Sequence, residues 1–152
     1  MLLANFAVLA TSLFAGAATY VSLVEHPARL RCSNEIALAQ WRPSYQRGTV
    51  MQASLAIAGT LLGISAWLSQ AGCIWLVAGI PLGSVVPFTL LVIFPTNKRL
   101  EDPTLDASSG TARSLLVRWG HLHAVRSLLS LASLLLMLFV SRCVGSETDC
   151  LS

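Results

Sequence analysis

Hydrophobic residues along the chain fall into four long runs separated by polar connections. The runs cover about residues 2–24, 49–68, 73–94 and 121–140. At about 1.5 Å of rise per residue, a helix of roughly twenty residues crosses the ~30 Å hydrocarbon core of a bilayer. Lipid permits only helices or closed barrels, and no segment here alternates as a barrel strand would. The pattern predicts an all-α protein, a four-helix transmembrane bundle with up-down-up-down topology.

Composition supports a membrane protein with a single domain. Of the 152 residues, 55% are hydrophobic and only 11% are charged, whereas a soluble domain carries about 25% charged residues. We expect one membrane domain over residues 1–141 and a short polar tail over 142–152. The net charge of +3 is small and the basic residues form no stripe, so nucleic-acid binding is excluded.

Two processing features bear on the ends of the chain. The first hydrophobic run lacks a positive n-region and is longer than the apolar core of a usual signal peptide, so a spanning helix is favoured over a cleaved signal. Cys143 and Cys150 are close enough in the tail to form a disulfide in an oxidising compartment. The four cysteines show no zinc-site spacing.

Basic residues predict the orientation in the membrane. They concentrate in the two long connections, after the first and third runs, as Arg29, Arg31, Arg42, Arg47, Lys98, Arg99, Arg113 and Arg118. The link between the second and third runs, "SQAG", has no charge. The positive-inside rule therefore places the long basic loops in the cytosol and both termini on the opposite side.

Because consecutive spans alternate in direction, four polar segments should meet at one membrane face. They are "VEHPARL", "WRPSYQRG", "FPTNKRL" and "RWGHLHAVRS". All three histidines of the chain, His26, His121 and His123, lie in these segments. The sequence therefore predicts a polar cluster to which all four helices contribute.

Local geometry refines this cluster. Pro27 and Pro95 disfavour helical geometry just before them, so we expect the first and third spans to end there. On a helix, His123 shares a face with Trp119 and Arg126, four and three residues away. His121 points elsewhere, so the histidine pair is not the i, i+4 metal clamp of zinc proteases. Ligands for iron, copper or zinc are present, but their spacing specifies no metal.

The clustered residues can also have ordinary structural roles instead of a role in function. Aromatic residues such as Trp119, Trp41 and Tyr45 can anchor helices at the membrane interface. The histidines can be interfacial polar groups satisfied by carbonyls. Gly59 and Gly63, like Gly79 and Gly83, give two spans a small face for close helix packing.

The polar segments also carry a family resemblance. The stretches "LFAGAATYVSLVEHPARL", "WRPSYQRGTVMQASLA", "VPFTLLVIFPTNKRL" and "LLVRWGHLHAVRSLLS" resemble, in order and spacing, a family of four-span membrane proteins that includes the fungal anthrone oxygenases. The resemblance covers roughly residues 10–135. It implies oxidation of an anthrone methylene to a quinone carbonyl with O2, and no established cofactor.

The resemblance suggests roles for the clustered residues. A base is needed, and His26 or His123 is expected to serve because the ordinary pKa of a histidine lies near the working range. Cationic or amide donors could hold the substrate anion, and three are present: Lys98, Arg126 and Asn97. The expected substrate-binding residues are Trp119, Tyr45, Glu25 and Arg42, the aromatic ones by stacking on a planar substrate.

The expected partners are the bilayer and a hydrophobic aromatic small molecule, of anthrone, phenol or quinol type, and the chain can also form a homo-oligomer. Two other functions stay open. One is a non-catalytic membrane protein that binds a lipid or a partner through its basic loops. The other is a metal- or haem-dependent redox protein, with iron or copper at the histidine cluster.

Overall fold

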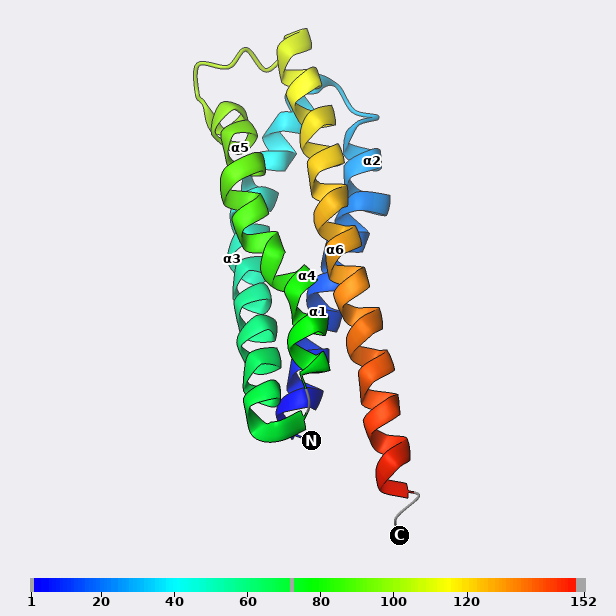
Figure 1. The fold of residues 1–152 in the computed structure, drawn as a ribbon. Coiled ribbons are helices and arrows are strands. Elements are labelled where there is room, and N and C mark those ends of the chain that lie inside the picture. Colours follow the sequence, from blue (N-terminus) through cyan, green and yellow to red (C-terminus); the bar gives the residue numbers. More distant parts are fainter. Residues whose placement is uncertain (1, 72, 150–152) are drawn as a thin grey trace.

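The computed structural model describes residues 2–71 and 73–149 (Figure 1). Its elements are α1 (Leu2–Tyr20), η1 (Val21–Glu25), α2 (His26–Arg29), α3 (Asn34–Ala66), η2 (Trp67–Ala71), α4 (Ile74–Phe88), η3 (Thr89–Ile93), α5 (Phe94–Glu101) and α6 (Gly110–Asp149), where η denotes a π-helical turn. The described residues contain no strand. The predicted all-α fold class is confirmed.

Four continuous helical segments are long and apolar enough to cross a membrane. They cover Leu2–Arg29, Asn34–Ser69, Ile74–Glu101 and Gly110–Arg142. Large hydrophobic side chains are exposed along their outer surfaces, including Leu23, Leu61, Leu91 and Leu128. This apolar exterior suits lipid and confirms the prediction of four helices that can span a bilayer.

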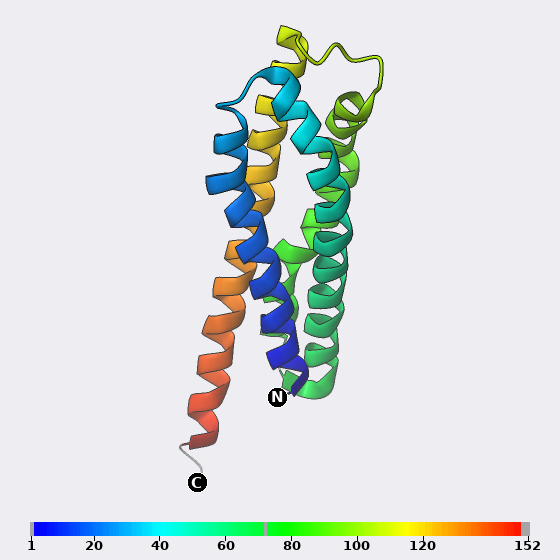
Figure 2. The ribbon, with the colours of Figure 1, turned by 180° about the vertical axis from the view of Figure 1, so that it is seen from behind.

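The helices form a bundle in which each packs mainly against two neighbours. The first and third segments both pack against α3 and α6. Figures 1 and 2 place the connections at residues 30–33 and 102–109 at one end of the bundle, called here the loop end. The beginning of α1 and the turn between α3 and α4 lie at the other end. The question of a disulfide between Cys143 and Cys150, which the sequence leaves open, concerns side chains outside the described part of the chain.

Two proline predictions were wrong in the same way. The helical path does not stop before Pro27 or Pro95, but continues into α2 and α5 through the π turns η1 and η3. In each turn, the residue before the proline donates its N–H to the carbonyl five residues earlier: His26 to Val21 and Phe94 to Thr89. A proline lacks an N–H and crowds the carbonyl four residues before it. The wider π turn relieves that crowding locally, so the helix continues.

The core consists of apolar layers along the bundle axis. One cluster lies away from the loop end and includes Ala7, Trp75 and Met137. A middle cluster surrounds Phe14 and Leu82, where a Cβ on Gly59 would lie 2.7 Å from Leu82 Cδ2. This contact agrees with the predicted close helix packing at Gly59. A third cluster at the loop end contains Leu38, Trp41, Leu100, Leu116 and Trp119.

Candidate functional site

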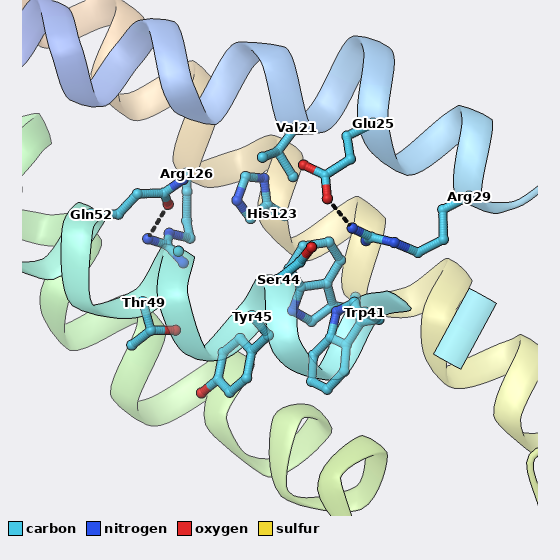
Figure 3. Close-up of a pocket in the computed structure, with 12 residues that line it drawn as sticks. Val21, Glu25, Arg29, Trp41, Ser44, Tyr45, Thr49, Gln52, His123 and Arg126 are labelled. Atoms are coloured by element: carbon cyan, nitrogen blue, oxygen red, sulfur yellow. Dashed lines mark hydrogen bonds and ion pairs between the residues drawn. The ribbon is translucent and has the colours of Figure 1, made fainter. Parts of the chain in front are cut away.

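A polar pocket lies between the first helical segment, α3 and α6, in the half of the bundle near the loop end (Figure 3). Its lining residues are Val21, Glu25, Arg29, Trp41, Ser44, Tyr45, Gly48, Thr49, Gln52, Trp119, His123 and Arg126. The free volume enclosed is about 40 Å³. The pocket occupies the level at which the hydrophobic runs of the sequence give way to the polar loop-end segments.

His123 and Arg126 face the pocket from α6, as their three-residue spacing predicts. His123 is only 3% exposed, and the hydrogen bond described for its ring joins Nδ1 to Ser22 Oγ at 3.0 Å. Arg126 is 9% exposed and donates from Nη2 to Gln52 Oε1 at 2.9 Å. No carboxylate among the described residues forms an ion pair with Arg126. Its guanidinium is therefore a buried cation whose hydrogen-bond partner is neutral.

Glu25 and Arg29 close another side of the pocket. Arg29 Nη2 lies 2.5 Å from Glu25 Oε1, forming an ion pair within one helical turn. Gln40 of α3 bonds both members of the pair. The Arg29 guanidinium also lies 3.2 Å from His26 Nδ1. Arg29 is thus neutralised locally, in contrast to Arg126.

His26 lies behind the pocket wall rather than in it. Its ring is buried between Arg29 and α6, and its centroid lies 5.1 Å from that of Trp119. A Cβ on Gly120 would overlap the His26 ring. Glycine at that position is therefore what lets the histidine of the first segment reach α6.

Aromatic rings form a continuous wall of the pocket. Tyr45 stacks on Trp41 with centroids 4.8 Å apart and an interplanar angle of 4°. Trp41 meets Trp119 edge to face at 5.7 Å, and Trp119 lies 4.8 Å from the His123 ring. Two of the lining residues carry a buried N–H that finds no acceptor among the described residues, Trp41 at Nε1 and Arg126 at Nε. Buried donors normally have partners, so these two N–H groups of the pocket wall remain free to donate to an acceptor.

The remaining predicted site residues lie outside the pocket. Asn97 is buried and donates to the Tyr45 hydroxyl at 3.0 Å, so it contacts a lining residue. Lys98 is exposed, with Nζ 5.0 Å from the centroid of the Phe94 ring. Arg42 donates to the Leu100 and Asp102 carbonyls, which fixes the end of α5. The structure therefore gathers Glu25, Tyr45, Trp119, His123 and Arg126, and leaves Lys98 and Arg42 elsewhere.

Comparison with known proteins decides the family. A family model described as anthrone oxygenase matches residues 41–136. Anthrone oxygenase tpcL of Aspergillus fumigatus is 36% identical over 135 residues, covering 82% of this chain and 84% of the relative. Anthrone oxygenase AgnL2 of Paecilomyces divaricatus is 33% identical over 146 residues, covering 86% and 89%. The chain belongs to the anthrone oxygenase family. No solved structure matches it significantly.

The anthrone oxygenase match covers most of the pocket. Residues 41–136 include the aromatic wall on α3 together with His123 and Arg126 of α6. Glu25 and Arg29 lie before the matched region. The region matched by the family model therefore contains the pocket residues of α3 and α6. The pocket residues of the first helical segment lie before that region.

Sequence reasoning missed several residues of this anthrone oxygenase-family pocket. Gln52, the partner of Arg126, was detectable as the one amide in the run 49–68. Arg29 was assigned to the basic loop, although it follows Glu25 by four residues and can pair with it on a helix. Ser22 and Ser127 gave no sequence signal, because serines are common in membrane helices.

Among the described residues, no group of three His, Cys, Asp or Glu side chains is arranged to hold a metal ion.

Proposed function

We propose that this protein is a membrane-embedded oxygenase that converts the methylene group of an anthrone to a carbonyl with O2 in the polar pocket. One observation carries the proposal. The lining residues include a buried imidazole and a buried guanidinium that has no ion pair among the described residues. They also carry two N–H donors without an acceptor there, one of them on that guanidinium. This set suits a substrate that loses a proton and becomes an oxyanion. The relatives, which are named anthrone oxygenases, suggest the chemical class.

His123 is the proposed base and Arg126 the proposed anion holder. Removing a proton from the anthrone methylene gives an aromatic anion whose charge resides largely on the ketone oxygen. Nε2 of His123 takes the proton, because Nδ1 is engaged by Ser22. The oxygen accepts from Arg126 Nε and Trp41 Nε1, for which the described part of the chain offers no acceptor. His26, which does not line the pocket, holds the wall by packing against Trp119.

The oxygen step needs no group from the protein that gains or loses electrons. The substrate anion gives one electron to O2, and the resulting radical and superoxide combine at the former methylene carbon. The peroxide takes up the proton to become a hydroperoxide. Loss of the second hydrogen from that carbon, with cleavage of the O–O bond, releases water and leaves the carbonyl. In sum, anthrone and O2 give anthraquinone and H2O, so we propose a cofactor-independent reaction.

Substrate must open the pocket as it binds. The free volume of about 40 Å³ is far below the roughly 300 to 1,000 Å³ of typical ligand pockets. The mouth lies between η1 and α3, where Thr49 is exposed and Val21, Ser44 and Gly48 are partly exposed. We propose that a planar substrate partitions from the bilayer, inserts its reactive edge here and stacks on the aromatic wall. We also propose that this face is cytosolic, because the positive-inside rule predicts cytosolic basic loops.

Oxygen uptake by detergent-purified protein tests the proposal. With a hydroxylated anthrone, wild type should form one quinone per O2 consumed, above the rate of spontaneous autoxidation and without accumulating H2O2. His123→Ala should lower kcat/KM by about 100-fold or more, the usual contribution of a general base. His121→Ala is the matched control, because His121 lies two residues away on the exposed face of α6. Equal rates for wild type and His123→Ala would refute the assignment of the base.

A further inference from the structure

His123 lines the pocket, and its ring nitrogen Nδ1 is joined to two serine hydroxyls. Its Nδ1 lies 3.0 Å from Ser22 Oγ on η1. Ser22 Oγ lies 2.8 Å from Ser127 Oγ on α6. Ser127 Oγ in turn lies 2.9 Å from the Ala18 carbonyl and 3.3 Å from the His123 carbonyl. These contacts form a short chain of hydrogen bonds between the first helical segment and α6.

This series of hydrogen bonds ends on carbonyl oxygens. That fixes which atom donates and which accepts in each bond. A carbonyl can only accept, so the single hydroxyl proton of Ser127 is directed to Ala18 or to its own helix. Ser127 Oγ must then accept from Ser22. With its proton directed to Ser127, Ser22 Oγ must accept from His123, so Nδ1 carries a hydrogen. In neutral imidazole only one ring nitrogen is protonated.

We propose that Ser22 and Ser127 are positioning residues that hold His123 in the Nδ1–H tautomer and so direct the lone pair of Nε2 into the pocket. The inference rests on the proposed function for its catalytic meaning. In the other tautomer, Nε2 would present an N–H to the substrate and could not remove a proton. After His123 takes the proton, Nδ1–H still donates to Ser22, so the hydroxyl chain serves both states without rearrangement.

The local fold explains how the two serines meet. Ser22 lies on the π turn η1, one turn after Ala18, and Ala15 and Ala18 are fully buried. Small residues let α1 and α6 approach closely enough for hydroxyls to bond across the helices. On α6, Ser130 and Ser133 continue the row and donate to backbone carbonyls. Of these serines, only Ser22 bonds the imidazole.

Nitrogen NMR of the substrate-free protein tests the tautomer directly. Protein labelled with ¹⁵N-histidine, with His26→Gln and His121→Gln variants to assign the signals, should show His123 with a protonated Nδ1 and an unprotonated Nε2 above its titration. Ser22→Ala removes the acceptor, so its His123 should shift towards the Nε2–H tautomer. Ser22→Thr keeps a hydroxyl and should restore the wild-type signal. A wild-type His123 protonated at Nε2 would overturn the inference, and that result needs no variant to fold.

Kinetics provide the second readout. Ser22→Ala and Ser127→Ala should each lower kcat with an anthrone by about 10-fold, in the range seen when a partner that orients a histidine is removed, with KM nearly unchanged. Ser133→Ala is the matched control, because it also removes a buried α6 hydroxyl that donates to a carbonyl. It should leave both the tautomer and kcat unchanged. Unchanged tautomer and kcat in Ser22→Ala would refute the positioning role.

The two proposals fail separately. Suppose that no anthrone is oxidised, but His123 shows the expected tautomer and Ser22→Ala shifts it. The oxygenase proposal is then refuted, while the positioning role of the two serines is supported. If oxidation depends on His123 but the imidazole carries its proton on Nε2, the hydroxyl chain is wrong and the oxygenase proposal survives.

Discussion

Arg126 is the residue whose burial most needs an explanation. A guanidinium that is largely removed from water loses hydration, and its partner Gln52 is a neutral amide. A buried charge without an opposite charge is costly. Arg29, at the other side of the pocket, avoids this cost by pairing with Glu25. The difference between the two arginines supports an anionic ligand next to Arg126.

Replacing Arg126 should therefore separate activity from stability. For Arg126→Gln we expect kcat/KM with an anthrone to fall by about 100-fold, the order seen when one donor to a developing oxyanion is lost. Thermal unfolding in detergent should occur at the same temperature or higher, because an uncompensated buried charge is removed. Arg118→Gln, an exposed change on the same helix, should alter neither quantity. A large loss of stability in Arg126→Gln would mean that the cation serves the fold.

At this scale, sequence reasoning succeeded where helical spacing decides which side chains meet. His123, Arg126 and Trp119 share one face of α6, and the structure directs them to one pocket. Lys98 and Arg42 lie in the predicted polar segments but outside the pocket, Lys98 at the surface and Arg42 at the end of α5. The polar segment in which a residue lies determines its level along the bundle axis. The direction in which its side chain points also depends on the rotation of the helix about its own axis, which packing sets and no local sequence pattern encodes.

At the scale of elements, the two π turns are the main departure from the sequence prediction. Pro27 and Pro95 were expected to end helices, and instead η1 and η3 absorb them. The consequence for the site is direct. Because the helix continues, Glu25 and Arg29 remain one turn apart and form the ion pair that borders the pocket. If the helix had ended at His26, the side chains of Glu25 and Arg29 would not be held on the same helix face.

The mouth between η1 and α3 can be narrowed without disturbing the packing. Gly48 lines the pocket, and a Cβ added there would meet no atom within 4 Å. Gly48→Leu should therefore fold normally but obstruct the substrate, raising KM for an anthrone about 10-fold, roughly 1.4 kcal/mol of binding free energy. Gly16→Leu is the matched control, because Gly16 is also a helical glycine with no neighbour within 4 Å, and it lies outside the pocket. Equal KM values for the two variants would place the mouth elsewhere.

On the scale of the whole molecule, the fold followed from the hydrophobic pattern because lipid leaves few alternatives. Four apolar runs predicted four helices, and the polar segments at their ends predicted one polar level, where the pocket lies. The hydrophobic pattern could not predict how the pocket is enclosed by apolar side chains. Apolar layers around Phe14 and around Leu38 lie in the middle of the bundle and at the loop end. Apolar layers beside a polar pocket lower the local dielectric constant, which strengthens its electrostatic interactions.

Orientation in the membrane is the last prediction, and the chain carries its own probes. Cys32 is an exposed free cysteine in the loop-end connection, and Cys73 is an exposed free cysteine at the turn before α4, at the opposite end. The positive-inside rule places the loop end in the cytosol. In sealed microsomes, whose outer surface is cytosolic, a membrane-impermeant maleimide should label a variant that retains only Cys32. A variant that retains only Cys73 should react only after detergent is added, which also shows that its thiol is reactive. Labelling of Cys73 in sealed vesicles, with Cys32 protected until detergent, would reverse the topology and move the mouth of the pocket to the lumenal face.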